Sequence, residues 1–281
     1  TSPPQSFREA MRRDAEFTKA ITPDDTWGQA IIRGGQSQIK RKSFTWMTRS
    51  EASKLCPGQV YTTGAKKGQI KPIGTSEVFK QKYDPATGDP KKKARMTARG
   101  DQLVGPKYHR DIYQPTLRSE SLRILFAIAV QLDLLICSLD FTAAYLFSDL
   151  PEPVAVKIPK GMAKYFGVPG ELVDKSSGLP IDDAIIVYNK SIFGLPRPGQ
   201  LWGETLKKLL TGVLEFTKSN LDPCTFIKEF FLHGEKVTII MLVFVDDAIA
   251  AVTDIHAWSW LTQQIKSNKF EFTDNGAAGE A

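Results

Sequence analysis

The strongest chemical signal in the sequence is a pair of adjacent aspartates, Asp246 and Asp247, inside the otherwise apolar stretch 241–250. Burying two like charges side by side is unfavourable, because their repulsion adds to the desolvation of each carboxylate. A tight turn that brings both side chains to the tip of a hairpin avoids much of this penalty, and a divalent cation that prefers oxygen ligands, Mg²⁺ or Mn²⁺, compensates the charge. The alternative is a solvated Asp-Asp turn between two ordinary strands.

A third carboxylate, Asp140, follows another short apolar segment, 134–139. Alone, an aspartate in this position is commonly a helix cap. Two apolar strands that each deliver carboxylates from one end supply three oxygen-ligand side chains, which suits a site for two metal ions. In such a site one ion activates the attacking oxygen, and the other holds a triphosphate and stabilises the leaving group.

Hydrophobic periodicity and turn signals indicate the elements that must position these carboxylates. Strands are predicted at 134–139, which should be buried on both faces, and at 237–243 and 249–252, on either side of the aspartate pair. Further strands are predicted at 185–188 and 230–233, and 77–83 with 93–98 should form a basic hairpin. Helices are predicted at 1–20, 119–132, 198–216 and 256–269.

Details of these elements can also be predicted from single residues. Ser119 should cap the helix at 119–132, and the apolar stripe of the helix at 198–216, which includes Trp202, is interpreted as plain core. Residues 28–74 carry a poor pattern and are expected to be loops joining short strands. Residues 151–180 are rich in Pro and Gly and are expected to form a loop.

Composition bounds the classes of protein to which the chain can belong. With 281 residues, 42% hydrophobic and 24% charged, it is long enough for one large globular domain or two smaller ones. Charged residues interrupt its longest apolar stretches, 122–139 and 237–252, so no membrane span is expected. Three scattered cysteines do not form a disulfide framework or a zinc cluster, which favours an intracellular, reducing compartment. The GxxxxGK[ST] phosphate-binding motif is absent from the sequence.

Charge is divided unevenly along the chain. Residues 1–110 contain 22 Lys and Arg against 10 Asp and Glu, whereas residues 111–281 contain 15 against 21. A basic portion suits a polyanion such as nucleic acid, and an acidic portion suits divalent cations or solubility. The alternative for the basic portion is an ordinary solvated surface.

Several motifs together resemble the reverse transcriptase of copia-type LTR retrotransposons. The central ones are Asp140-Phe-Thr-Ala-Ala-Tyr-Leu, Lys190-Ser-Ile-Phe-Gly-Leu and Phe244-Val-Asp-Asp, in this order. The likeness extends upstream through Lys93-Ala-Arg-Met-Thr-Ala-Arg-Gly and downstream to Lys269-Phe-Glu. The combination covers about residues 70 to 275 and is far more specific than any single motif.

This resemblance implies roles for the acidic residues and for two of their neighbours. Asp140 and Asp246 would be the metal ligands and Asp247 would complete the pair, with two Mg²⁺ ions, or Mn²⁺, as cofactors. Tyr145 would be a steric gate that lies under the sugar of the incoming nucleotide and collides with a 2′-hydroxyl, or else would simply pack on the following helix. Phe141 would belong to the nucleotide-binding site.

The resemblance also implies a set of nucleotide and nucleic-acid contacts outside these motifs. Arg95 would reach the triphosphate, and the backbone of Phe193 and Gly194 would lie close to the incoming base. Lys93, Arg99 and Arg197 would contact nucleic acid. The sequence departs from the family at one point, because Gly194-Leu-Pro-Arg stands where the family typically has Gly-Leu-Lys-Gln. Arg197 would replace part of the lost positive charge.

The fold implied by the resemblance is α+β, the fingers and palm of a right-hand polymerase with an antiparallel palm sheet backed by helices. The expected parts are an N-terminal helical extension at 1–35, fingers at 36–118 and 151–184, and palm at 119–150 and 185–281. The thumb is expected to be missing, because the chain stops just after Phe270-Glu-Phe. RNase H and integrase domains are expected partners that the sequence does not contain.

The predicted function is that of an RNA-directed DNA polymerase, a nucleotidyltransferase that adds dNTPs to a DNA primer on an RNA template as part of a retrotransposon polyprotein. Its location would be intracellular, in a cytoplasmic virus-like particle or in the nucleus. One alternative is a domesticated or decayed remnant that binds nucleic acid or a protein partner without polymerising. Another, an RNA-directed RNA polymerase, is disfavoured by Tyr145, since RNA synthesis needs room for the 2′-hydroxyl.

Overall fold

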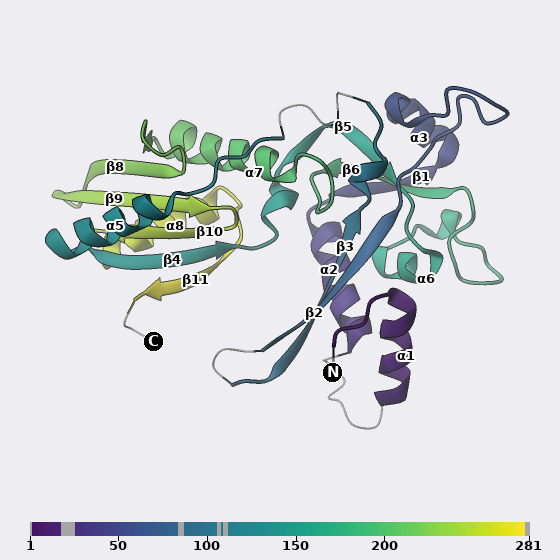
Figure 1. Ribbon diagram of the computed structural model, residues 1–281, viewed down its shortest axis with the longest axis horizontal. Helices are drawn as coiled ribbons and strands as arrows, with labels where there is room; N and C mark the ends of the chain where they lie inside the picture. Colours follow the sequence, from purple (N-terminus) through teal and green to yellow (C-terminus); the bar gives the residue numbers. More distant parts are fainter. Residues whose placement is uncertain (1, 18–25, 84–86, 106–107, 109–111, 279–281) are drawn as a thin grey trace. The chain divides into compact units, whose positions relative to one another are not determined.

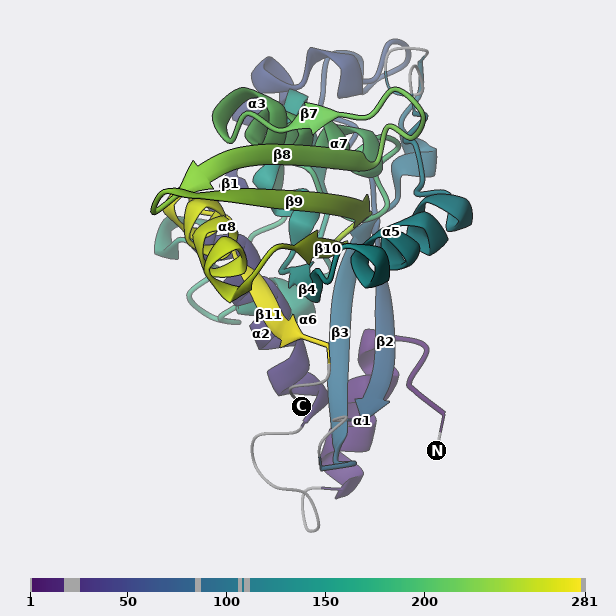
Figure 2. The same cartoon turned by 90° about the vertical axis from the view of Figure 1, so that its left-hand side faces the viewer.

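The computed structural model describes residues 2–17, 26–83, 87–105, 108 and 112–278. The chain divides into two compact units, each made of two segments. The first unit comprises Thr1–Arg110 and Asp149–Pro198, and the second comprises Asp111–Ser148 and Gly199–Ala281. Figures 1 and 2 show the elements of both units, which are described separately below.

The first unit contains two antiparallel pieces of β-structure and several helices. Its elements are α1 (Phe7–Phe17), α2 (Trp27–Lys40), β1 (Phe44–Thr48), α3 (Arg49–Leu55), β2 (Thr75–Tyr83), β3 (Pro90–Ala98), β5 (Asp149–Val156), α6 (Lys160–Ala163) and β6 (Ala184–Lys190). Within the described residues, β1, β6 and β5 form a three-stranded sheet in that order, and β2 pairs with β3 alone. The predicted basic hairpin is confirmed, with Thr75 opposite Ala98 and Tyr83 opposite Pro90.

The second unit is built around a larger antiparallel sheet. Its elements are α5 (Ser119–Gln131), β4 (Leu135–Phe141), α7 (Pro198–Lys207), β7 (Thr217–Lys218), β8 (Thr225–Leu232), β9 (Glu235–Phe244), β10 (Asp247–Val252), α8 (Ile255–Ser267) and β11 (Phe272–Ala277). Among the described residues, the sheet has six strands in the order β11-β4-β10-β9-β8-β7. The mixed architecture with antiparallel sheets agrees with the predicted α+β class.

Helices cover both faces of this sheet. On one face, buried side chains of β4, β9 and β10 pack with α7 and α8 around Trp202, Leu210 and Trp258. On the other face, Leu125 and Ala129 of α5 pack against the same strands. Both faces of β4 are therefore covered, as predicted, although its first residue, Leu135, remains exposed.

The prediction of loops joining short strands at 28–74 is wrong for much of that segment, because the helices α2 and α3 lie there. The short strand β1 agrees with it. Adjacent glycines are typical of loops, yet Gly34 and Gly35 both lie inside α2. A Cβ added at Gly35 would come within 2.7 Å of the carbonyl oxygen of Tyr165, and one at Gly34 within 3.2 Å of that of Ala94. The two glycines therefore allow close packing of a helix rather than breaking it.

Other boundaries differ from the prediction for similar tertiary reasons. The predicted loop at 151–180 contains most of β5, whose Val154 and Val156 pair with β6. Strand β11 was not predicted, and it adds a neighbour on the outer side of β4. The helix predicted at 198–216 is α-helical only to Lys207 and continues as a π-helical segment over Lys208–Val213.

Ser119 does not cap α5, which corrects a further prediction. The N-cap position is Arg118, and its own side chain makes no capping hydrogen bond. The carboxylate of Asp222, far along the chain, instead accepts hydrogen bonds from the Arg118 amide and the Ser121 hydroxyl. Spacing within the helix could not reveal a cap that comes from a distant loop.

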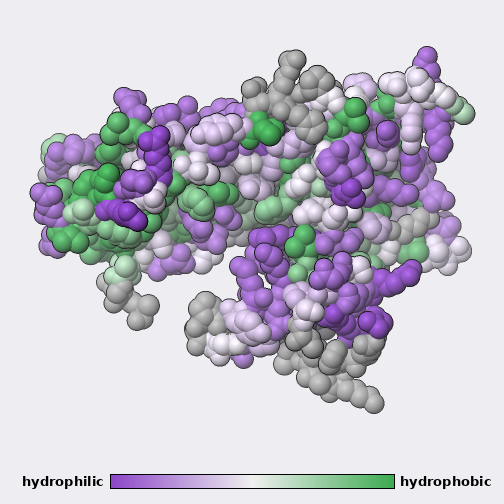
Figure 3. Space-filling view, in the orientation of Figure 1, coloured by the Kyte–Doolittle hydropathy of each residue, from purple (hydrophilic) through white to green (hydrophobic). Residues whose placement is uncertain are grey.

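The described surface of the second unit is partly apolar. Ile124, Phe126 and Val130 of α5 are exposed, and Figure 3 shows hydrophobic side chains gathered over this helix. Among the described residues, no helix is both long and apolar enough to span a bilayer.

Candidate active site

The backbone of the second unit brings the three predicted carboxylates to one end of its sheet. In the antiparallel pairing of β10 with β4, Asp247 lies directly opposite Asp140. The amide of Phe141 donates a hydrogen bond of 2.7 Å to the carbonyl oxygen of Asp246. Antiparallel pairs alternate, so the neighbouring pair Asp140–Asp247 is of the type without mutual hydrogen bonds, in which side chains approach most closely.

Alternation along the strands decides which way these carboxylates face. Leu139 and Phe141 of β4 and Ala248 of β10 are buried in the core formed with α7 and α8. Successive side chains in a strand point to opposite faces, so Asp140 and Asp247 lie together on the face that α5 covers further along the sheet. Both aspartates are exposed, beyond the end of the apolar packing.

A tight turn joins β9 to β10 and carries the aspartate pair, as the sequence predicts. Phe244, the last residue of β9, pairs with Asp247, the first residue of β10, so only Val245 and Asp246 lie between the strands. Val245 adopts a left-handed conformation with φ of 57°. Asp246 is half-buried at the tip of this hairpin.

Phe141 is the last residue of β4 and directly follows Asp140. Its side chain is only 1% exposed, and its ring packs edge-on against that of Trp202, with ring centroids 5.1 Å apart. Its amide is bonded to Asp246 and its ring is in the core, so Phe141 supports the turn that carries the aspartates. Its predicted role in nucleotide binding stays a prediction.

Tyr145 lies on a short 3-10 helix, Ala144–Phe147, that follows β4. Its ring is half-buried and packs against the core of the second unit. This position, shortly after Asp140 in the same unit, is compatible with the predicted gate and with the packing alternative. The role of Tyr145 stays a prediction.

The first unit brings three of the predicted nucleotide-binding residues together. The guanidinium carbon of Arg95, on β3, lies 4.7 Å from the centroid of the Phe193 ring. The amides of Ala98 and Gly100, at and just beyond the end of β3, donate to the carbonyl oxygens of Phe193 and Gly194 at 2.8 and 3.0 Å. The hairpin is thus joined to the loop after β6 by backbone bonds and by a cation–π contact.

Glycine is required at position 194 by two features of this junction. The backbone of Gly194 has φ of 87°, which L-amino acids with side chains rarely adopt. A Cβ added there would also collide with the carbonyl oxygen of Ala98. The close approach that this glycine permits here is to the end of β3. The predicted approach of the Gly194 backbone to an incoming base stays a prediction.

The remaining predicted contacts are basic residues of the first unit. Lys93 lies opposite Lys80 in the hairpin. Arg99 forms a bidentate ion pair with Asp101, at 2.8 and 2.9 Å, which raises the pKa of Arg99 and lowers that of Asp101. Arg197 is half-buried just before α7. A phosphate that binds Arg99 would compete with the carboxylate of Asp101 for the guanidinium. Lys93, in contrast, faces another lysine across the hairpin.

Sequence reasoning missed one residue that touches the aspartate turn. Trp202 was interpreted as part of a plain core stripe, but its indole N–H donates a hydrogen bond to the carbonyl oxygen of Val245. A buried indole usually needs an acceptor, so a Trp within an otherwise aliphatic stripe was the available signal. The identity of its acceptor could not be read from the sequence.

The described side chains do not by themselves form a finished metal centre. In the part of the chain that the structure describes, no three His, Cys, Asp or Glu residues are grouped so that they could hold a metal ion. The backbone thus makes Asp140, Asp246 and Asp247 neighbours, and their convergence on cations stays a prediction.

Comparison with known families identifies the chain. The family model described as "Reverse transcriptase (RNA-dependent DNA polymerase)" matches residues 59–280, which is most of the sequence. The chain belongs to this reverse transcriptase family. The predicted resemblance to reverse transcriptases of copia-type retrotransposons and the predicted enzyme class, nucleotidyltransferase, are both confirmed.

A curated relative supports the same assignment. The chain is 28% identical over 209 residues to the "Retrovirus-related Pol polyprotein from transposon TNT 1-94" of Nicotiana tabacum. The aligned part is 74% of this reverse transcriptase chain but only 14% of that polyprotein. The match therefore concerns one portion of a much longer relative.

Proposed function

We propose that this chain is the polymerase portion of a retrotransposon Pol polyprotein and that it extends a DNA primer with dNTPs on an RNA template. The observation that carries the proposal is the pairing of Asp247 with Asp140 beside a turn that also presents Asp246. Membership in the reverse transcriptase family supports the same chemistry.

The donor set fits a divalent cation. Like charges directly opposite one another in an antiparallel pair are destabilising, and Asp140 and Asp247 occupy such a pair. The three side chains of this motif are carboxylates, whose oxygens are the ligands that Mg²⁺ and Mn²⁺ prefer. We therefore infer that Asp140 and Asp246, assisted by Asp247, hold two such ions. When bound, these ions lower the pKa of a primer 3′-hydroxyl and neutralise charge on the departing pyrophosphate.

The protein's own residues would supply positioning and selection. Arg95 carries a fixed positive charge and is steadied by the Phe193 ring, which suits it to bind the triphosphate. Tyr145 would exclude a 2′-hydroxyl and so select dNTPs. In this proposal the second unit acts as the palm and the first unit as the fingers of a polymerase.

The basic hairpin would bind the phosphates of the template or of the nucleotide. Lys80 lies opposite Lys93, and Lys82 lies opposite Lys91, so like charges face one another across the strands. Such pairs weaken an isolated hairpin, and a polyanion removes the repulsion. Figure 3 shows hydrophilic side chains over this hairpin.

Primer extension on an RNA template tests the proposal. We expect extension with dNTPs and Mg²⁺, and a loss of about a thousandfold in rate for Asp140→Asn and Asp246→Asn, because each removes a charge that would bind a cation. Asp133→Asn is the matched control. Asp133 is exposed in the same unit and has φ of 52°, a conformation that Asn tolerates well.

The outcomes separate the alternatives. Unchanged extension by Asp246→Asn would refute the metal-site assignment. Extension with rNTPs alone would indicate an RNA polymerase and overturn the role of Tyr145. Absence of extension together with salt-sensitive RNA binding would instead favour a protein that binds nucleic acid without polymerising.

A further inference from the structure

The turn that presents Asp246 and Asp247 contains a strained residue. Val245 has φ of 57°, and a β-branched side chain is rarely found in that left-handed region. A residue held in such a conformation persists only where the surrounding structure fixes it. The position of the two aspartates therefore depends on whatever holds the backbone of Val245.

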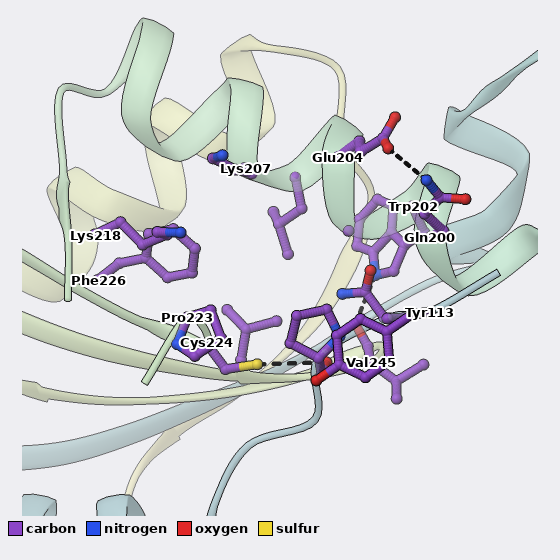
Figure 4. Close-up of a pocket in the computed structure, with 15 residues that line it drawn as sticks. Tyr113, Gln200, Trp202, Glu204, Lys207, Lys218, Pro223, Cys224, Phe226 and Val245 are labelled. Carbon is purple, nitrogen blue, oxygen red and sulfur yellow. Dashed lines mark hydrogen bonds between the residues drawn. The ribbon is translucent and has the colours of Figure 1, made fainter. Parts of the chain in front are cut away.

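The indole of Trp202 is hydrogen-bonded to this backbone. Its Nε1–H donates to the carbonyl oxygen of Val245 at 2.5 Å, and Figure 4 shows the two residues together in the wall of a pocket. We propose that Trp202 is a positioning residue, which fixes the carbonyl of Val245 and so holds Asp246 and Asp247 in place against Asp140. The effect of Trp202 on catalysis rests on the proposed polymerase function, whereas its contacts with the turn do not.

The same indole also supports the other half of the site. Phe141 directly follows Asp140, and its ring packs edge-on against Trp202 with centroids 5.1 Å apart. The amide of Phe141 then donates to the carbonyl of Asp246, which directly follows Val245. One side chain thus contacts the residue after the first carboxylate and the residue before the second, so it couples the two strands that carry them.

The indole is itself rigidly held. Trp202 is 1% exposed, and the rings of Phe147 and Phe270 lie 6.0 and 6.1 Å from it, centroid to centroid. Aromatic contacts at these separations orient a ring as well as burying it. Because the indole of Trp202 cannot move, its hydrogen bond restrains the carbonyl of Val245. A mobile donor would shift together with the carbonyl and restrain it little.

Packing alone does not fix the turn on this side. A cavity of about 240 Å³ lies beside the bond, lined by Trp202, Val243 and Val245 together with Tyr113, Gln200 and Phe226. Where the turn borders this cavity, it has fewer protein neighbours and is restrained less by packing than a turn in a filled core. The directional bond from Trp202 therefore carries more of the restraint than it would in a filled core.

The protein offers a matched control for this bond. Trp258 on α8 is buried in the same core, 3% exposed, and its Nε1–H donates to a carboxylate oxygen of Asp274 at 3.0 Å. Trp202→Phe and Trp258→Phe each remove one buried indole N–H and keep an aromatic ring. Only the first removes a bond to the aspartate turn, so the pair separates positioning from general stability.

Two measurements on the full chain test the proposal without requiring activity. Hydrogen exchange of the peptide covering 241–250 reports opening of the turn, and electron paramagnetic resonance of free Mn²⁺ reports metal affinity. We expect Trp202→Phe to speed exchange and weaken Mn²⁺ binding by about two- to tenfold, the range for a lost hydrogen bond, and Trp258→Phe to change neither. Equal exchange in the two variants would overturn the proposal, even if the wild type binds no Mn²⁺.

Activity provides a third, separable measurement. If the chain extends primers, Trp202→Phe should lower kcat and raise the Mg²⁺ concentration needed for half-maximal rate, with little change in the KM for dNTP. A wild type that does not extend primers would refute the proposed function, whereas the exchange experiment would still decide the role of Trp202.

A second substitution tests whether the bond acts through Val245. Glycine adopts positive φ without strain, so the turn in Val245→Gly should need less help from the indole. We expect Trp202→Phe to have a smaller effect on turn exchange in the Val245→Gly background than in the wild type, as a double-mutant cycle would measure. Equal effects in both backgrounds would show that the bond does not act by holding this residue, and would overturn that mechanism.

Discussion

Single residues at the end of β4 show how alternation and charge together define the candidate site. The strand buries Leu139 and Phe141 on one face, which obliges Asp140 to lie on the other. The same rule places Asp247 opposite it on β10. Two like charges that face each other at the ends of neighbouring strands repel one another, and a bound cation would remove this repulsion, which is the physical basis of the metal proposal.

Selection of the sugar is argued from Tyr145, a single side chain on the short helix after β4. Replacing Tyr145 with Ala would remove the ring that is proposed to collide with a 2′-hydroxyl. We expect the ratio of rNTP to dNTP incorporation to rise by at least about tenfold, measured by primer extension with each nucleotide. Tyr145→Phe is the control, because it keeps the ring and should keep the selection. An unchanged ratio in Tyr145→Ala would assign the ring to packing alone.

At the scale of elements, the N-terminus of α5 depends on a residue from a distant loop. Asp222 is 3% exposed, and its two carboxylate oxygens accept bonds from the Arg118 amide, the Ser121 hydroxyl and the Cys224 amide. Burial raises the pKa of Asp222, but these hydrogen bonds outweigh it, and the pKa lies below its ordinary value. The ionised carboxylate therefore stabilises the attachment of α5 to the sheet.

This linkage predicts a pH dependence of stability. A carboxyl whose pKa is lowered by folding contributes stability above its unfolded pKa, about 3.9, and loses it as the pH falls through the lower folded value. We expect Asp222→Ala to lose about 2–3 kcal/mol at pH 7, because three donors lose their acceptor, and the difference from wild type to shrink below about pH 4. Urea unfolding at a series of pH values measures both.

Asp174 provides the comparison for Asp222. Hydrogen bonds from Ser176 and Ser177 lower the pKa of Asp174 to about 2, yet its side chain is exposed. We expect Asp174→Ala to lose clearly less stability at pH 7, since water replaces the lost acceptor. A larger loss for Asp174→Ala than for Asp222→Ala would contradict the argument from burial.

The junction between β3 and the loop after β6 should also contribute to the stability of the first unit. Gly194→Ala should lower the free energy of unfolding of the first unit by about 3 kcal/mol or more, because it adds both a left-handed backbone penalty and a collision with Ala98. Gly178 also has positive φ but has nothing within 4 Å of an added Cβ, so Gly178→Ala should lose only about 1 kcal/mol. Chemical denaturation of the two variants tests this, and equal losses would show that the close approach is unimportant.

Comparison of these elements shows what the sequence could predict. Local periodicity was enough for the hairpin β2–β3, for β4, β9 and β10, and for α5 and α8, because each carries its own apolar pattern. It failed for α2, where two glycines serve packing against distant backbone, and for β11, which is defined by its pairing with β4. The carboxylates were predictable from residue type, whereas the supports from Trp202 and Asp222 depend on contacts between segments far apart in sequence.

At the scale of the whole molecule, the uneven charge follows the division of the chain closely. Residues 1–110, which carry the excess of Lys and Arg, all belong to the first unit, whereas the three aspartates of the candidate site belong to the second. Polyanion binding is therefore expected to depend on the first unit and cation binding on the second. Substitutions in the two units should then separate these activities.

The salt dependence of RNA binding tests this division. Lys91, Lys92 and Lys93 lie in the hairpin strand β3, and each phosphate contact contributes about 0.7 to the slope of log K against log salt for a single strand. Replacing all three with Gln should reduce the magnitude of that slope by about 2 and weaken binding similarly for all sequences. Fluorescence anisotropy with single-stranded RNA at several KCl concentrations measures the slope.

The control for this experiment removes the same charge from the second unit. Lys208, Lys236 and Lys269 are exposed there, and their replacement with Gln lowers the net charge of the protein equally. Their triple variant should keep the wild-type slope, because counterion release depends on the phosphates contacted and not on net charge alone. If the magnitude of the slope fell equally in both triple variants, the overall charge of the protein would account for RNA binding. The hairpin would then have no special role in it.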